Sequence, residues 1–142
     1  MTNIYLDIGG VLLIDATPAK HADIFIEYIV TNYNTYWLST HCQQKEGYIP
    51  SILSRYFSEK TMKFIKQVKT ATYKTNKSEA IDFSTHFLWF DDHLYKEDKQ
   101  ILIKYGLLDN WIEVNLRKNE NQLGKFLNSF PTLIQIIKQT TK

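Results

Sequence analysis

The fold of this chain is decided near its start, by residues 4–12, Ile4-Tyr5-Leu6-Asp7-Ile8-Gly9-Gly10-Val11-Leu12. Apolar and aromatic side chains lead to a single carboxylate, Asp7, and two glycines follow almost at once. This pattern predicts a buried strand that ends at one edge of a sheet and passes into a tight turn. A carboxylate at the carboxyl end of a parallel strand faces the crevice where α/β proteins bind ligands, and it can act there as a nucleophile or a metal ligand.

Length and composition indicate a single globular domain. The chain has 142 residues, enough to bury one sizeable core, and its hydrophobic content of 44% is ordinary for such a domain. A net charge of +2 is too small to indicate nucleic-acid or membrane binding by itself. Cys42 is the single cysteine, so an internal disulfide is excluded and a reducing compartment is favoured.

The sequence also favours a cytoplasmic protein without a membrane partner. Strand-like sequence follows directly after Met-Thr-Asn-Ile. The charged segment followed by an apolar segment that is typical of a signal peptide is not seen there. No apolar run reaches the roughly 20 residues that a membrane-spanning helix needs.

Predicted strands alternate with predicted helices along the whole chain. The strands are expected at Asn3–Ile8, Thr35–Ser39, Phe87–Phe90 and Trp111–Asn115. The helices are expected at about 19–31, 49–57, 59–68, 75–83, 96–104 and 121–137. Such alternation favours parallel strands joined by right-handed crossovers, so the predicted class is a three-layered α/β fold in one domain.

Three local signals set helix ends in this prediction. Thr17 followed by Pro18 resembles an N-cap followed by proline at the first helical position. Gly106 is expected to end the helix at 96–104 as its C-cap. Pro131 is expected to interrupt the last helix, because proline removes a backbone donor.

Side chains with reactive groups end three of the predicted strands. Asp7 follows the first strand, Ser39 and Thr40 follow the second, and the pair Asp91-Asp92 follows the third. In an open parallel sheet these ends line one crevice. Carboxylates from two strands are suited to Mg²⁺, which prefers oxygen ligands and is usually held by few carboxylates.

Lys77 is the candidate cation for this crevice. It lies at the start of the predicted helix that precedes the third strand. A helix N-terminus already favours anions, and an ammonium group there would neutralise Asp7 or a bound phosphate.

With these motifs in their order, the sequence resembles the haloacid dehalogenase superfamily of phosphotransferases. The motifs of that superfamily are matched by Asp7-Ile8-Gly9-Gly10-Val11, by Trp37-Leu38-Ser39, by Lys77, and by Leu88-Trp89-Phe90-Asp91-Asp92. Together they cover about the first two-thirds of the chain. The compact length and the tryptophan-containing strands are most similar to the small domains of this superfamily found in some RNA-repair proteins.

The resemblance implies a Rossmann-like sheet without a full cap domain and a set of residue roles. Residues 43–75 fall where larger relatives insert the cap. Asp7 would attack phosphorus and form an aspartyl-phosphate, while Lys77 would screen charge between Asp7 and the phosphoryl group. Mg²⁺ would be held by Asp7, the backbone carbonyl of Gly9 and Asp91, with Asp92 as a further or alternative ligand. Ser39, or Thr40 if the motif is shifted by one residue, would bind a phosphate oxygen.

Gly9 departs from the pattern of the phosphatases in this superfamily. They carry an aspartate two residues after the nucleophile, which protonates the leaving group and then activates water, work worth about 10²–10⁴ in rate. Glycine has no side chain for this work, whereas its carbonyl remains available to a metal. Asp15, His41 and His93 are neighbouring candidates for a substitute acid. A slow or substrate-assisted phosphatase, a non-catalytic relative and an altered version of an active parent all remain open.

An open site of this kind suits a phosphorylated substrate, either a small molecule or a nucleic-acid end. The residues also have structural interpretations: Asp7 as a turn cap, Asp91-Asp92 as a solvated turn, Lys77 as a surface lysine and Ser39 as a backbone cap. Lysines across 60–77 are interpreted chiefly as a solvated helix face, and nucleic-acid contact is the alternative. Cys42 and the histidines show no nucleophile or metal-ligand pattern.

Overall fold

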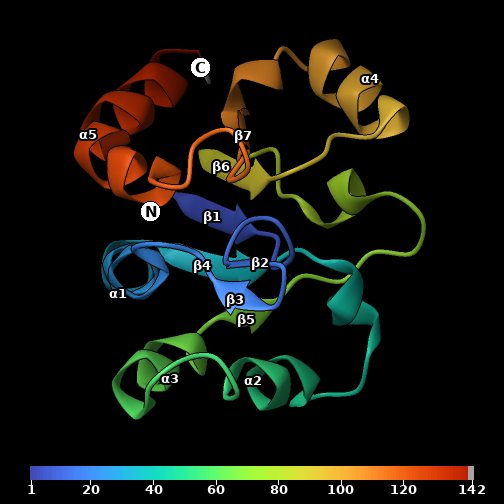
Figure 1. The fold of residues 1–142 in the computed structure, drawn as a ribbon. Coiled ribbons are helices and arrows are strands. Elements are labelled where there is room, and N and C mark those ends of the chain that lie inside the picture. The colour runs from blue at the N-terminus through green and yellow to red at the C-terminus, as the bar shows by residue number, and fades with distance from the viewer. Residues whose placement is uncertain (141–142) are drawn as a thin grey trace.

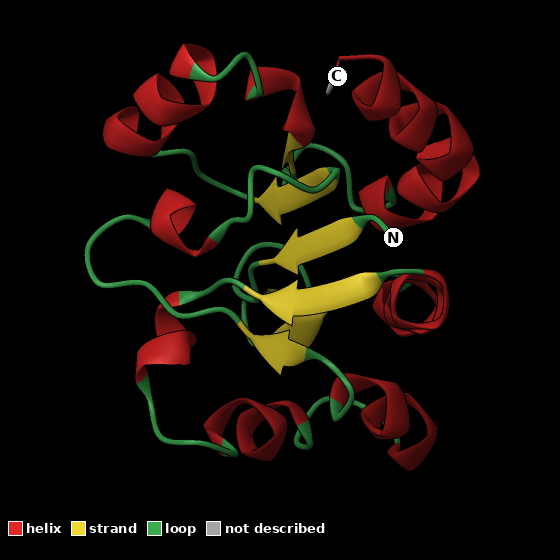
Figure 2. Cartoon of the chain, turned by 180° about the vertical axis from the view of Figure 1, so that it is seen from behind, coloured by secondary structure: helices red, strands yellow, loops and turns green. Residues whose placement is uncertain are grey.

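The structure is a computed structural model that describes residues 1–140. Its centre is a parallel sheet of five strands (Figure 1). The strands lie in the order β5-β4-β1-β6-β7. Their bounds are β1 Asn3–Leu6, β4 Asn34–Trp37, β5 Lys69–Thr70, β6 Phe87–Asp91 and β7 Trp111–Glu113. The three central strands point the same way when the molecule is seen from behind (Figure 2).

The chain reverses its direction across the sheet beside β1. From β1 it proceeds outward to β4 and β5, and it then returns to β6 and β7 on the other side of β1. In the register of β1 and β6, Tyr5 lies opposite Trp89 and Leu6 opposite Phe90. The crevice between the carboxyl ends of β1 and β6 is therefore the switch point at which sheets of this kind bind ligands.

Helices cover both faces of the sheet, so the predicted three-layered α/β class is confirmed (Figure 2). One face carries α1 (Ala22–Asn32), α2 (Tyr48–Leu53), α3 (Glu59–Ile65) and α5 (Gln122–Thr140). The other carries the 3₁₀ turn η2 (Lys77–Ala80) and α4 (Lys96–Lys104). Two further 3₁₀ turns are η1 (Thr40–Gln43) and η3 (Leu108–Asn110).

Alternating side chains of β1 enter the two cores. Ile4 and Leu6 pack in the cluster that includes Phe25 of α1, whereas Tyr5 packs in the cluster that includes Leu102 of α4. All of β1 is buried because both faces of the sheet are covered, which explains why its sequence is apolar without interruption.

The prediction that Thr17 and Pro18 begin a helix is wrong. They form β3, which pairs with β2 (Leu13–Ile14) in an antiparallel hairpin. The carbonyl of Leu12 accepts a hydrogen bond from the N–H of Ala19 at 2.8 Å, which holds the hairpin closed. Helix α1 therefore begins at Ala22, after His21 with a left-handed φ of 65°.

Other predicted boundaries also change. The helix expected at 75–83 is only the short 3₁₀ turn η2, and the helix expected at 59–68 ends at Ile65. Strand β5, which the sequence did not predict, follows at Lys69–Thr70. Helix α5 continues across Pro131, whose missing donor is tolerated while Phe130 and Ile134 are buried in the core. Helix α4 has its predicted bounds, and Gly106 (φ 69°) follows it.

Residues 43–75 contain most of the crossover from β4 to β5, β5 itself and the start of the segment that leads to η2. They contain α2, α3 and β5, and α3 packs against α1 rather than standing apart from the sheet. Across residues 1–140, the helices all fall short of the length and apolar character that a membrane span requires.

Candidate functional site

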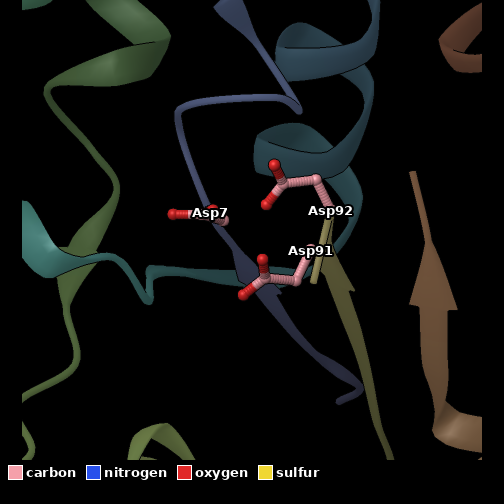
Figure 3. Close-up of side chains that lie close together, drawn as sticks. All are labelled: Asp7, Asp91 and Asp92. Atoms are coloured by element: carbon pink, nitrogen blue, oxygen red, sulfur yellow. The ribbon is translucent and has the colours of Figure 1, made fainter. Parts of the chain in front are cut away.

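Three carboxylates meet at the switch point of the sheet. Asp7 directly follows β1, Asp91 ends the adjacent β6, and Asp92 follows it (Figure 3). One oxygen from each lies within 4.8 Å of the others. The carboxyl ends of two neighbouring parallel strands thus bring together acids that are 84 residues apart in sequence (91 − 7).

Asp91 is held in a defined orientation. It is 1% exposed, and its Oδ2 accepts a hydrogen bond from the indole Nε1 of Trp89 at 3.3 Å. Its Oδ1 accepts a hydrogen bond from the backbone N–H of His93 at 3.2 Å. Trp89 reaches Asp91 because residues two apart on a strand share a face.

Lys77 lies between the two strand-end acids, Asp7 and Asp91. Its Nζ is 2.8 Å from Oδ2 of Asp91 and 3.5 Å from Oδ1 of Asp7. Lys77 is 8% exposed, so this ammonium is buried and paired. A buried lysine with two carboxylate partners differs from the solvated surface lysine that was the alternative interpretation.

Two acidic residues fix the short turn that carries Lys77. The carboxylate of Glu79 accepts hydrogen bonds from the backbone N–H groups of residues 74–76. Asp98 of α4, 2% exposed, accepts a hydrogen bond from the N–H of Ser78 at 3.0 Å. The turn is therefore anchored on both sides of Lys77.

Burial, together with repulsion between the carboxylates, raises the pKa values of the three acids. Burial raises the pKa of Asp7, and Lys77 offsets part of the rise. Burial and the charge of Asp7 raise the pKa of Asp91 to about 6, again offset in part by Lys77. Burial and Asp91 raise the pKa of Asp92. Burial lowers the pKa of Lys77, but Asp7 and Asp91 outweigh it, so the net shift is upward.

The three carboxylates form a donor set that could hold a metal ion. Three carboxylates face one ammonium, which leaves a formal charge of −2 when all the acids are ionised. The ligand atoms are all oxygen, which suits a hard cation.

Ser39 and Thr40 differ in their placement at the end of β4. Ser39 is buried and its hydroxyl oxygen accepts a hydrogen bond from the N–H of His41 at 3.2 Å. Thr40 is exposed at the first position of η1. In this bond the Ser39 hydroxyl oxygen is the acceptor, so the bond does not use the hydroxyl proton.

The two glycines after Asp7 serve different purposes. Gly10 has φ +78°, and a Cβ built on it would lie 2.8 Å from Cβ of Asp92, so glycine is required there. Gly9 is exposed, and its backbone φ lies outside the left-handed region. Among the described residues, apart from the chain neighbours of Gly9, no heavy atom lies within 4 Å of a Cβ built there.

Each candidate substitute acid has a partner of its own. The carboxylate of Asp15 pairs with Arg117, with N–O distances of 2.9 and 3.3 Å. The ring of His93 lies edge-on to Tyr95 at 4.4 Å between centroids, and the ring of His41 lies 5.7 Å from that of Tyr48. This arrangement selects none of the three.

Sequence reasoning missed the contacts of Trp89 and Tyr73 with the site, whereas it already interpreted Cys42 as a residue without a nucleophile pattern. Trp89 was detectable from its position two residues before Asp91. Tyr73 has a pKa raised by burial, and its phenol interacts with the charges of Lys77 and Asp7. Cys42 donates to the carbonyl of Trp37 at 3.3 Å, and burial raises its thiol pKa, which fits a structural role.

The fold and the site define an α/β protein with a Rossmann-like parallel sheet and an acidic, lysine-bridged site at its switch point. Comparison of the chain with protein-family models, with curated proteins and with solved structures found no match.

Proposed function

We propose that this protein is a Mg²⁺-dependent phosphohydrolase or phosphotransferase of the haloacid dehalogenase type, with Asp7 as its nucleophile and with turnover limited by Gly9. The observation that carries the proposal is the buried Lys77 bridging Asp7 and Asp91, with Asp92 beside them. The order of the strands supports it, since β1 and β6 are neighbours at the switch point.

The first step is attack by a carboxylate oxygen of Asp7 on phosphorus. The new O–P bond forms as the ester P–O bond breaks, and the electron pair leaves with the ester oxygen. Lys77 holds Asp7 in place and balances charge as the phosphoryl group arrives, while the Ser39 hydroxyl donates to a phosphoryl oxygen. Mg²⁺, held by Asp7, Asp91, Asp92 and the Gly9 carbonyl, would neutralise phosphoryl charge.

The second step is hydrolysis of the aspartyl-phosphate by water. Here the attacking water must lose a proton, and in the first step the leaving oxygen must gain one. Gly9 supplies no group for either transfer, so both depend on solvent or on the substrate. The structure therefore favours slow turnover, and it favours good leaving groups over poor ones.

Gly9 also favours a second candidate, a cation-dependent phosphate-binding or regulatory module without turnover. Such a module would keep the carboxylate cluster and Lys77, because both serve binding. Its ligand would be a phosphorylated small molecule or a phosphorylated nucleic-acid end. Salt-dependent binding to RNA or DNA ends would identify the latter.

Hydrolysis of 4-nitrophenyl phosphate with and without Mg²⁺ tests the proposal. Asp7→Asn should abolish Mg²⁺-dependent hydrolysis, while Asp109→Asn, which changes an exposed carboxylate in η3, should not. Activity that survives in Asp7→Asn would reject the nucleophile assignment. Binding of inorganic phosphate with Mg²⁺ but without any hydrolysis would support the second candidate instead.

A further inference from the structure

A cavity of about 390 Å³ opens directly beside the carboxylate site. Gly9, Gly10 and Asp92 form its wall toward the site. Its size lies within the range of small-molecule pockets, of about 300–1,000 Å³. Asp92 belongs both to the carboxylate cluster and to the cavity wall, so a molecule with its phosphoryl group at the cluster has this cavity beside it for the rest of its body.

The far walls of the cavity combine apolar and polar side chains. Leu13 and Ile14 come from the hairpin after β1, and Val114 and Leu116 come from the segment after β7. Among the described residues other than the chain neighbours of Gly9, no heavy atom lies within 4 Å of a Cβ built on Gly9, and Asp92 is the member of the carboxylate cluster that lines the cavity. The apolar side chains of the far walls suit a ring or a short hydrocarbon body.

A charged pair lies at the border of the cavity. Arg117 and Asp15 both line it, and the guanidinium binds both oxygens of the carboxylate at 2.9 and 3.3 Å. The side chains are 72% and 70% exposed, so solvent screens the pair and it stabilises the fold little. Arg117 can thus exchange Asp15 for another carboxylate at small cost.

We propose that this cavity binds the organic part of phosphomonoesters that carry a carboxylate, with Arg117 as the specificity-determining residue and Asp15 as its internal competitor. Asp15 shows the ligand geometry, because a carboxylate already binds the guanidinium through both oxygens. The inference rests on the proposed function for the placement of the phosphoryl group at Asp7.

The two partners of the ion pair should then act in opposite directions. Arg117→Gln removes the group that binds the ligand carboxylate, and Asp15→Asn removes the group that competes with it. If the pair merely ties the hairpin to the segment after β7, both substitutions break the same tie and should have the same effect.

Two non-hydrolysable probes test this inference: benzylphosphonate and 4-carboxybenzylphosphonate, titrated calorimetrically in the presence of Mg²⁺. The wild type should bind the carboxylated probe about tenfold more tightly. Arg117→Gln should reduce this ratio to about one, and Asp15→Asn should raise it severalfold. The control Lys118→Gln, an exposed cation next in sequence, should leave the ratio unchanged.

The inference is overturned if the wild type binds both probes equally, or if Arg117→Gln and Asp15→Asn shift the ratio the same way. Equal effects of Arg117→Gln and Lys118→Gln on the ratio would also overturn it, because any loss of positive charge nearby would then have the same effect as the loss of Arg117. Phosphatase activity with equal probe binding rejects the cavity assignment alone. Tenfold tighter binding of the carboxylated probe without any phosphate hydrolysis rejects turnover and keeps the cavity assignment. If neither probe binds, both the proposed function and the cavity assignment are rejected.

Discussion

If the proposed function holds, replacing Gly9 with aspartate should raise the rate of phosphate-ester hydrolysis without disturbing the fold. Gly9 is exposed, has no left-handed φ, and has open space where a Cβ would stand. Replacing glycine at such a position stabilises a protein by about 0.4–1 kcal/mol through the unfolded state. The added carboxylate repels the three already present, so the two effects oppose each other. We expect a change in melting temperature within about 3 °C.

The expected gain in activity is much larger than the change in stability. A positioned general acid and base contributes about 10²–10⁴ in rate, which corresponds to about 2.7–5.4 kcal/mol of activation free energy. The gain should be greater for alkyl phosphates than for 4-nitrophenyl phosphate, because an alkoxide needs a proton to leave and nitrophenolate does not. The difference between these substrates therefore identifies the role of the new carboxylate.

The assay compares kcat/KM for both substrates in wild type, Gly9→Asp and Gly9→Asn, each with saturating Mg²⁺. Asparagine has the shape of aspartate and cannot accept a proton, so Gly9→Asn should stay near the wild-type rate. Equal rates in Gly9→Asp and Gly9→Asn, with both proteins folded, would refute the reasoning that Gly9 is the missing acid–base position.

Four further outcomes follow from the same geometry. Gly10→Ala should destabilise the protein by about 1–3 kcal/mol in chemical unfolding, because the methyl group meets Asp92 and the backbone is left-handed; an unchanged unfolding midpoint would contradict this. Burial and the charge of Asp7 raise the pKa of Asp91 to about 6, so below pH 6 protons compete with the cation for this carboxylate. For each proton that the cation displaces, the Mg²⁺ affinity measured by calorimetry should fall about tenfold with each pH unit below 6. The pKa of Asp91 is higher in the folded protein than in the unfolded chain, so ionisation of Asp91 should destabilise the cation-free protein as the pH rises from about 4 to 6. If the contribution of Asp91 to the melting temperature increased over this pH range, it would contradict the prediction. Asp98→Ala should cost about 1–3 kcal/mol by leaving the Ser78 N–H without its acceptor, and it should weaken phosphate binding in step, whereas Asp109→Ala should do neither.

Local sequence carried much of the fold. The apolar run before Asp7 and the run before Asp91 are strands, because strands covered on both faces need apolar side chains throughout. Helix α4 has its predicted bounds because Gly106 supplies a left-handed residue after it.

Other elements depended on contacts that local sequence does not show. Thr17 and Pro18 carry a helix-start signal, yet the hairpin contact between Leu12 and Ala19 makes them a strand. Strand β5 has only two residues, and pairing with β4 defines it. Packing keeps α5 continuous across Pro131.

For the site, the sequence by itself determined which residues end the strands: Asp7 and Asp91 follow apolar runs, and parallel strands bring their ends to one edge. Only the tertiary structure decided the surroundings of these acids. The short turn fixed by Glu79 and Asp98 places Lys77 between them, and the pairing of Asp15 with Arg117 closes a contact across 102 residues. Strand ends are local properties, whereas these contacts depend on how loops of different elements meet in space.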